Sequence, residues 1–562
     1  MGVINFSEAN CRNCYKCIRH CPVKAIQMVN KQAQIIEDLC IGCGNCFKVC
    51  PQNAKNVVSF VDQIKEWLKN ETVVLSLAPS FPSAFDLEDP NCLLTALRTL
   101  GFEKIEETAI GAEIVSEYYA KDYQSTKKHV ITTSCPTVNL LIEKYYPQAV
   151  PYLSEVLTPM LTHAKILHHK YPETKIVFVG PCISKKLEAE ECPEDIDAVM
   201  SFDELREWLA AEKIEIKKLQ PGKFDSTASD VARYYPLTGG VVKSSFSKNK
   251  AKRHIVKIDG LDNCRDFLDH IEDLKDGYWI EMNACVESCI NGPGNVESPM
   301  IKYEKKERVR QYIQNNPREN IEIKKYNLDY SRKFSAKPID YVRVVPEEDI
   351  QSIMHKMGKF KHEDELNCGS CGYDTCREKA IAVYNGMAEV DMCLPYMRNL
   401  NETMSNLIIG STPNAIVVCD NEMRIIEFNY AAEKIFKVSH QAVQGQIFQE
   451  VLDYHPFSKM AGSNTYSGRG YYPKGQIHFI EVLAYVPEHQ MYIGIFVDIS
   501  DKIRKEEAYK KMQIESFEMA QKVVDKQMRV AHQIAELLGE TTAETRVSMT
   551  KIKNLIQPEE IE

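Results

Sequence analysis

The sequence predicts a multidomain α/β protein, on three observations. Its 562 residues exceed the roughly 100–200 residues of a single domain. Strand-like and helix-like segments alternate along residues 61–330, which is typical of parallel sheets flanked by helices. The 20 cysteines fall largely in spaced groups, so metal-binding modules are expected within and beside the α/β region.

Charge and hydropathy exclude several classes of function. The net charge of −10 and the pI of about 5.9 disfavour a nucleic-acid partner, which needs a basic surface. No apolar run approaches the roughly 18 residues of a membrane span. The first residues, MGVINFSEANCRNC, show neither a secretory leader nor a twin arginine. We therefore expect a cytoplasmic protein without membrane or nucleic-acid partners, in which clustered cysteines bind metal.

Residues 1–60 contain the spacing C-x2-C-x2-C-x3-C-P twice. This repeat resembles the two-cluster bacterial ferredoxins, in which the fourth cysteine of each run binds the other cluster. A disulfide knot or zinc sites are the alternatives. The resemblance implies an electron relay with two [4Fe–4S] clusters. The expected ligands are Cys11, Cys14, Cys17 and Cys50 for one cluster, and Cys40, Cys43, Cys46 and Cys21 for the other.

Four further cysteines lie at or beyond the ends of strand-like runs. HVITTSC ends at Cys135, KIVFVGPC at Cys182 and YWIEMNAC at Cys285, and Cys289 follows four residues later. The carboxyl ends of strands in an α/β sheet are where such folds bind cofactors. Four thiolates brought together there can hold a [4Fe–4S] cluster.

These segments, TTSCPT, GPCISKKLE and EMNACVESC, resemble the active-site signatures of [FeFe]-hydrogenases. LAPSFPSAF, LGFEKIEETAIGAE, DIDAVMSFDEL and PLTGGV also follow that family's order, so the resemblance covers residues 61–335. It implies reversible conversion of H2 into protons and electrons at an H-cluster. Cys135, Cys182, Cys285 and Cys289 would hold its cubane. Cys289 would also bridge to a diiron subsite carrying CO, cyanide and azadithiolate.

The resemblance also assigns residues around the subsite. Lys185 matches the family lysine that hydrogen-bonds a cyanide, and Glu188 matches a carboxylate near that lysine. A buried lysine is plausible only beside an anion. A solvated helix face is the alternative for such a pair. Thr158 begins a Thr-Pro-Met segment that matches one lining the diiron pocket.

The proton path departs from the family pattern. Ser134 occupies the position of the proton-donating cysteine, and a hydroxyl is a far weaker acid than a thiol. Two relay glutamates are replaced by Tyr119 and Asp122, whereas the relay serine is kept as Ser154. Proton delivery is expected to be slow, or to use Tyr119, Glu188 or water. Slow turnover suits a sensor.

Residues 300–350 are rich in charge, and we expect an exposed helix and a linker without chemistry. Within residues 336–400, the spacing C-x2-C-x4-C-x16-C-x-P resembles a small [4Fe–4S] module of anaerobic redox proteins. Zinc is the alternative. The expected ligands are Cys368, Cys371, Cys376 and Cys393.

Residues 401–500 resemble an α+β PAS domain, through PNAIVVCD, IIEFNYAAEKIF and the closing DIS. PAS domains bind ligands, haem or flavin, or only dimerise and relay. His440 and His455 are candidate haem ligands, although lone histidines are more often surface or core residues. We expect a relaying PAS domain without a cofactor.

Residues 501–562 are strongly helical. Their apolar positions suggest a seam for a partner helix in a homodimer, with packing on the PAS domain as the alternative. These positions are Ile503, Met512, Phe517, Val524, Met528 and Ile534. Gly539 is expected to end this helix and TTAETRVSMTKIKNLI to form another. No kinase or phosphatase motif follows, so we expect the output to act in trans.

Together these features predict a sensory [FeFe]-hydrogenase. Its expected partners are H2, protons, ferredoxin or a similar electron carrier, hydrogenase maturation proteins, and a kinase, phosphatase or regulator reached through the C-terminal helix. Two alternatives remain. One is a catalytic hydrogenase coupled to ferredoxin, and the other is a non-catalytic Fe–S scaffold that senses redox state.

Overall fold

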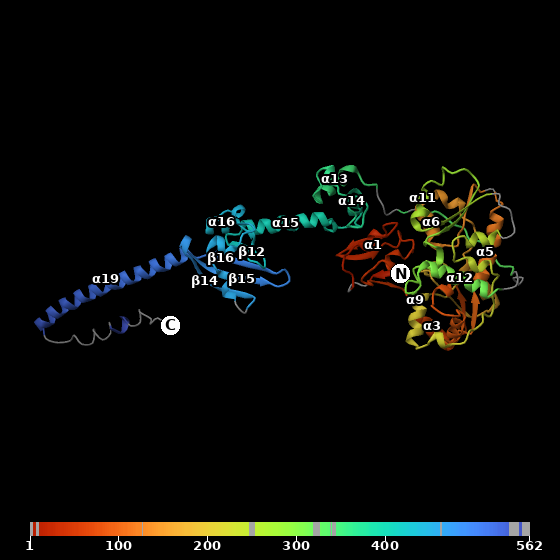
Figure 1. Ribbon diagram of the computed structural model, residues 1–562, viewed down its shortest axis with the longest axis horizontal. Coiled ribbons are helices and arrows are strands. Elements are labelled where there is room, and N and C mark those ends of the chain that lie inside the picture. Colours follow the sequence, from red (N-terminus) through yellow and green to blue (C-terminus); the bar gives the residue numbers. More distant parts are fainter. Residues whose placement is uncertain are drawn as a thin grey trace. The chain divides into compact units, whose positions relative to one another are not determined.

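A computed structural model describes residues 4–6, 10–125, 127–246, 253–317, 326–337, 339, 344–460, 463–538 and 550–553. The chain forms two compact units, Met1–Met397 and Arg398–Glu562 (Figure 1). Each is described by itself. The first unit contains the three cysteine-bearing regions, and the second contains an antiparallel sheet between two long helices.

The N-terminal region has small antiparallel ladders and two short helices inside its cysteine loops. The ladders pair β1 (Ile4–Phe6) with β4 (Lys55–Val57) and β2 (Ile26–Val29) with β3 (Gln32–Ile35). The helices are α1 (Lys16–Arg19) and α2 (Asn45–Lys48). Their core is small, and the cysteines themselves contribute to it. This core continues into the four-cysteine region, through Tyr373, Met387 and Met392.

Two parallel sheets form the centre of the α/β region. The first has the order β6 (Lys104–Glu107), β5 (Val73–Leu77), β8 (Lys175–Gly180), β9 (Ala198–Ser201). The second has the order β10 (His254–Asp259), β11 (Tyr278–Asn283), β7 (His129–Ile131). Most strands of the first sheet are fully buried, as expected for parallel strands with both faces covered. The predicted alternation is therefore confirmed.

The helices of this region cover the sheets. They are α3 (Val61–Asn70), α4 (Cys92–Thr99), α5 (Ala109–Asp122), α6 (Pro136–Tyr145), α7 (Pro159–Lys170), α8 (Ser184–Glu191), α9 (Phe202–Ala211), α10 (Gly240–Ser245), α11 (Leu261–Asp269) and α12 (Lys302–Asn315). Helices α5 and α7 touch at Gly111, where a β-carbon would lie 2.3 Å from the Pro159 carbonyl oxygen. Only glycine permits this approach, which brings the two helices together beside the cysteine sites.

The expectation of an exposed helix within residues 300–350 is only partly correct. Helix α12 buries Val309, Tyr312 and Ile313, although its mean composition is polar. Tyr312 packs edge-on against Phe81, so the inner stripe of this helix joins the core of the α/β region. The charged residues that dominate the sequence pattern occupy its other face.

The four-cysteine region follows as a helical module, with α13 (Glu347–Lys356) and α14 (Cys376–Tyr384). It contacts the N-terminal region closely. Arg19 donates to the carbonyls of Gly369 and Ser370 over 3.2 and 3.0 Å, and the Lys24 ammonium donates to the Gly372 carbonyl over 2.8 Å. These carbonyls belong to the loop around Cys371, so the module docks through its cysteine loop.

The second unit is built on a five-stranded antiparallel sheet with three short helices. The sheet order is β13 (Ile425–Phe428), β12 (Ala415–Cys419), β16 (Met491–Asp498), β15 (Ile477–Val486), β14 (Thr465–Tyr472). The short helices are α16 (Tyr430–Phe436), α17 (His440–Val443) and α18 (Phe448–Leu452). Aromatic rings fill the space between helices and sheet, with Phe436 against Phe448, Phe479 and Phe496.

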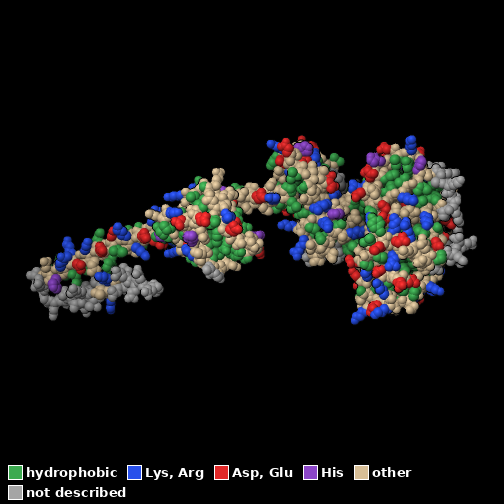
Figure 2. Space-filling view, viewed as in Figure 1, with side chains coloured by type: hydrophobic (Ala, Val, Ile, Leu, Met, Phe, Trp, Pro, Cys, Tyr) green, Lys and Arg blue, Asp and Glu red, His purple; other side chains and the backbone are tan. Residues whose placement is uncertain are grey.

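Two long helices flank this sheet in the sequence. Helix α15 (Leu394–Ser411) precedes the sheet in the chain and has no buried side chain. Helix α19 (Ser500–Leu538) follows the last strand. Figure 2 shows basic, acidic and hydrophobic side chains interspersed along α19. Of the proposed seam, Ile503, Phe517, Val524 and Met528 are half-buried, and Met512 and Ile534 are exposed. Gly539 and most of the second expected helix lie outside the described residues.

Among the helices that the structure describes, none combines the length and apolarity that crossing a membrane requires.

Candidate functional site

The four cysteines at the strand ends converge. Cys135 is the N-cap of α6, four residues after the end of β7. Cys182 lies between β8 and α8, and Cys285 and Cys289 follow β11. All four line one cavity of about 40 Å³, and none forms a disulfide. Two different sheets are needed to build this site, which explains why the cysteines are spread over half of the sequence.

The chemistry of this site fits a metal cluster. Burial raises the pKa of Cys182 to about 12 and that of Cys285 to about 11, and neighbouring thiols add to both shifts. Buried thiols that face one another are stable as thiolates only around a cation. The cavity is lined by the four strand-end cysteines, by Cys43 of the N-terminal region and by Lys185. The residues present therefore fit a [4Fe–4S] cluster.

A second cavity, of about 90 Å³, adjoins the first. Cys182, Lys185, Asn283, Ser134 and Cys289 line both. The remaining wall is mostly apolar, and its largest side chains are those of Met160, Phe178 and Tyr235. A thiol and an ammonium at a dry wall suit a group that is bound through sulfur and carries anionic ligands, so this cavity fits the diiron subsite that the sequence implies.

The Lys185 ammonium lies 2.7 Å from Glu188 Oε2. The Thr158 hydroxyl donates to the same oxygen over 3.0 Å, while Pro159 and Met160 line the second cavity. The structure therefore brings Lys185, Glu188 and Thr158 together, with Lys185 facing the cavity and the other two behind it. The other carboxylate oxygen, Glu188 Oε1, lies 3.2 Å from Arg332 Nη1, a contact that the sequence did not reveal.

A second hydrogen-bonded group surrounds Ser134. The Thr133 N–H donates to the Tyr119 hydroxyl oxygen over 2.8 Å, so the Tyr119 proton is directed elsewhere. Ser134 Oγ is 3.0 Å from that hydroxyl. Burial raises the pKa of Tyr119 to about 12, which makes it a weak acid at neutral pH. Ser154 instead donates to Asp122. The two residues that replace the family's relay glutamates therefore have different partners: Tyr119 contacts Ser134, and Asp122 contacts Ser154.

The eight ferredoxin-type cysteines lie in and around α1 and α2, and Cys43 lies near Cys21, Cys40 and Cys46, the other expected ligands of its cluster. Backbone amides donate to three of their sulfurs, from Ala25 to Cys21 at 3.2 Å, from Gly42 to Cys40 at 3.4 Å and from Ala54 to Cys50 at 3.4 Å. Such bonds stabilise thiolates. Burial also raises the pKa of Cys21 to about 11 and that of Cys43 well above its usual value.

The loop of Cys43 contacts the strand-end site directly. Gly42 and Cys43 line the 40 Å³ cavity beside Cys135. At Gly44, with φ of +70°, a β-carbon would lie 2.5 Å from Pro293, and the Lys48 ammonium donates to the Asn291 carbonyl over 2.5 Å. Of the two expected ferredoxin clusters, the one that Cys43 would bind therefore lies nearer this site.

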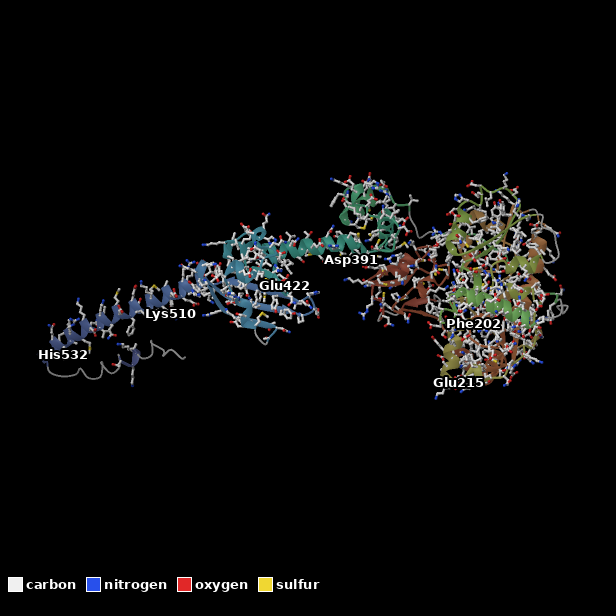
Figure 3. The ribbon with its side chains drawn as sticks, in the orientation of Figure 1. Phe202, Glu215, Asp391, Glu422, Lys510 and His532 are labelled. Carbon is white, nitrogen blue, oxygen red and sulfur yellow. The ribbon has the colours of Figure 1, made fainter. Side chains whose placement is uncertain are left out.

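The module's four cysteines also share a cavity, of about 20 Å³, lined by Cys368, Cys371, Cys376 and Cys393. The buried Lys379 lines it too, and desolvation lowers the pKa of this lysine while the nearby thiols oppose the shift. An ammonium held there favours an anionic four-thiolate site, with either Fe–S or zinc. Asp391, labelled in Figure 3, precedes Cys393 by two residues.

The two candidate haem ligands of the second unit, His440 and His455, are placed differently. A ring nitrogen of His440 lies 3.0 Å from the Phe428 carbonyl, and His455 is exposed. Neither histidine belongs to the aromatic core around Phe436. The described geometry gives no support to haem ligation by these residues.

Comparisons with known proteins agree with this arrangement. Residues 71–293 match the family model of the iron only hydrogenase large subunit, C-terminal domain, and residues 3–62 match a 4Fe-4S dicluster domain. Residues 364–395 match a putative Fe-S cluster family, and residues 404–467 match a PAS domain.

Three relatives show how far the similarity extends. Iron hydrogenase 1 of Clostridium pasteurianum is 26% identical over 42% of this chain and 52% of its own length, so about half of that protein is spanned. The periplasmic [Fe] hydrogenase large subunit of Nitratidesulfovibrio vulgaris is 27% identical over 53% of this chain and 87% of its own. The cytosolic Fe-S cluster assembly factor NAR1 of Yarrowia lipolytica is 30% identical over 23% and 31%.

The geometry and the matches lead to one assignment. The chain resembles the [FeFe]-hydrogenases. Its hydrogenase-like domain follows a region that matches a 4Fe-4S dicluster domain and precedes regions that match an Fe–S module and a PAS domain.

Proposed function

We propose that this protein is a sensory [FeFe]-hydrogenase, which converts H2 slowly and passes the electrons through its clusters toward the PAS domain. The observation that carries the proposal is a complete four-thiol site with Lys185 at its wall, combined with Ser134 where a thiol acid would stand. Such a site binds the cofactor and handles protons poorly, which fits detection better than bulk conversion.

When bound, the H-cluster would supply the oxidation of H2 to two protons and two electrons. Cys135, Cys182, Cys285 and Cys289 would hold it, and Lys185 would donate a hydrogen bond to an anionic ligand. The Met160 and Phe178 side chains would exclude water from the cavity. Proton transfer would pass through Ser134, whose hydroxyl is paired with the weakly acidic Tyr119. Both groups have pKa values far above neutral pH, so turnover would be slow.

Electrons have a contiguous set of cysteine sites to follow. The Cys43 loop lines the strand-end cavity, and the module packs closely on the N-terminal region, since a β-carbon added at Gly372 would lie only 2.9 Å from Ile18. Ile18 lies between Cys17 and Cys21, which are expected ligands of the two ferredoxin clusters. This supports electron flow to the module as well as to a separate electron carrier.

The module is connected to the PAS sheet by one helix. Cys393 immediately precedes α15, an uninterrupted helix of 18 residues. Asn429 holds its last turn, because its amide donates to the Ile409 carbonyl over 2.8 Å while its oxygen accepts from Ile416 and Ala432 over 2.9 Å. A shift at Cys393 would thus reach β12 and α16. A homodimer and a regulator bound in trans would receive the signal through α19.

Hydrogen-deuterium exchange tests the sensory part. Protein reconstituted with its [4Fe–4S] clusters and a synthetic diiron complex is compared under H2 and under N2. We expect altered exchange in residues 394–411 and 500–538 under H2, together with slow dye reduction. Unchanged exchange with rapid dye reduction would instead favour the catalytic, ferredoxin-linked hydrogenase.

The similarity to NAR1 favours one further candidate, an Fe–S scaffold or assembly-type protein that carries clusters without converting H2. It requires the four-thiol site but not a cationic pocket for an anionic subsite. The Lys185 contacts weigh against it. Absence of any H2-dependent change, with all [4Fe–4S] clusters present, would make this candidate the leading one.

A further inference from the structure

We infer that Arg332 is a positioning residue of the hydrogenase site. Arg332 and Lys185 share the Glu188 carboxylate, so Glu188 does not fully neutralise Lys185, and the Lys185 ammonium can attract an anionic ligand. The inference rests on the proposed function for the identity of that ligand. Arg332 lies beyond residues 71–293, where the hydrogenase family model ends, and the sequence pattern placed it in a linker.

The contacts divide the Glu188 carboxylate between two cations. Its Oε2 lies 2.7 Å from the Lys185 ammonium and its Oε1 lies 3.2 Å from Arg332 Nη1. The side chain of Glu188 is only 1% exposed, so solvent does not screen these charges. A buried lysine and glutamate alone would form a neutral pair, with little attraction left for a further anion. Adding Arg332 gives these three side chains a net charge of one positive unit. The other partner of Arg332, Glu191, is 39% exposed, so solvent screens its charge more strongly than that of Glu188.

The segment that carries Arg332 is fixed to the hydrogenase domain by its backbone. The Leu157 N–H donates to the Tyr330 carbonyl over 2.9 Å, and the Arg332 N–H donates to the Glu155 carbonyl over 3.2 Å. The Lys337 N–H donates to the Glu143 carbonyl over 2.7 Å. Tyr330 is buried. These backbone contacts hold the segment in place, so the Arg332 guanidinium is pre-organised for its contact with Glu188.

Arg332 also has a second partner, which allows a structural role to be separated from an electrostatic one. Its Nη2 lies 2.8 Å from Glu191, a residue that Lys337 also contacts at 3.2 Å. Glu191 is 39% exposed and does not contact Lys185 in the described structure. If Arg332 served only to anchor the segment, Glu191 would matter at least as much as Glu188.

The test compares four variants of the full chain, each reconstituted with [4Fe–4S] clusters: Arg332→Gln, Arg332→Lys, Glu191→Gln and the double variant Arg332→Gln/Glu188→Gln. The first readout is uptake of the synthetic diiron complex, followed by its cyanide infrared bands. We expect Arg332→Gln to lower affinity about tenfold to a hundredfold, as loss of outer partners of metal sites does, and to shift the cyanide bands. Arg332→Lys should keep part of the affinity, and Glu191→Gln nearly all of it.

The double variant best separates an electrostatic role of Arg332 from an anchoring role. Removing the Glu188 charge restores a net positive Lys185 although Arg332 is absent, and the glutamine oxygen still accepts from Lys185. Affinity should therefore recover toward the wild-type value. An anchoring role predicts no recovery, and equal losses in Glu191→Gln and Arg332→Gln would overturn the inference.

A second readout does not need the diiron complex. The reduction potential of the [4Fe–4S] cluster at Cys135 should fall in Arg332→Gln, because a nearby positive charge is lost, and should rise again in the double variant. If wild-type protein takes up no diiron complex, the proposed function fails while the potentials still decide the role of Arg332. Unchanged potentials in Arg332→Gln would contradict it.

Discussion

The two compact units of this chain have different interiors. In the first, cavities remain where thiols and lysines meet, around Cys182 with Lys185 and around Cys371 with Lys379. In the second, aromatic rings fill the interior, and Phe436 alone contacts five other rings. Close packing of the kind seen in the second unit stabilises a fold by itself. The first unit combines a large apolar core with sites that are complete only when a charged group is bound.

This difference has a consequence for variants. Changes at the cavities of the first unit should alter metal content and chemistry. Changes in the rings of the second unit should alter its stability while leaving metal content intact. The following substitutions test this contrast.

Cys182→Ala should have the largest effect. It removes one of four sulfur ligands from the strand-end site, so both the cubane and any diiron group bound beside it should be lost. Iron and sulfide content and electron paramagnetic resonance measure the loss. Cys419→Ala is the matched control, because Cys419 is a buried cysteine of β12 in the second unit. An equal loss of iron in both variants would contradict the assignment.

Phe436→Ala should destabilise the second unit by about 3–5 kcal/mol, as large-to-small changes at aromatic core positions do. Its ring is 3% exposed. A calorimetric scan should show two unfolding transitions. Only the transition of the second unit should move to lower temperature, and the iron content should stay constant. A shift of both transitions by the same amount would show that the two units unfold as one.

Ser134→Cys should raise the turnover rate at neutral pH roughly tenfold or more, within the range of general acid catalysis. A thiol at this position has a pKa much nearer neutral than a hydroxyl. Dye-linked hydrogen oxidation measures the change, and Ser154→Cys serves as a control because Ser154 contacts Asp122 rather than Ser134. If only the control gained activity, proton transfer would follow the Asp122 contact instead.

Asn429→Ala should have the smallest effect on stability, about 1–2 kcal/mol for the loss of a helix cap and its bonds. The substitution should nevertheless strongly reduce the H2-dependent change in hydrogen exchange, because Asn429 joins α15 to β12 and α16. Exchange of residues 500–538 under H2 would then approach that under N2. Asn421→Ala, in the exposed turn between β12 and β13, is the control and should leave the response unchanged.

Much of the candidate site could be predicted from the sequence because its information is local. Cysteine spacings specify the ferredoxin repeat, and Lys185 and Glu188 share a helix face three residues apart, so their ion pair follows from helix geometry. The parallel sheets follow from the alternating segments. The cluster ligand assignments themselves remain predictions, since they rest on motifs and on shared cavities.

The missing parts depend on contacts distant in sequence. Arg332 reaches Glu188 across 144 residues, and its surroundings read as charged linker. Tyr119 and Ser134 are in contact because α5 packs close to the end of β7. The hydrophobic periodicity of the sequence does not predict this packing. The docking of Arg19 on the Gly369 carbonyl involves a backbone acceptor, and backbone acceptors carry no residue-type signal. In α12, frequent charges hid an inner stripe that includes Tyr312.

The most direct test of the central claim is infrared spectroscopy of anaerobically reconstituted protein, given the synthetic diiron complex and then H2. We predict bands of iron-bound CO and cyanide that shift when H2 is admitted and return under N2. Protein that contains all of its [4Fe–4S] clusters and yet shows no such bands would contradict the hydrogenase proposal.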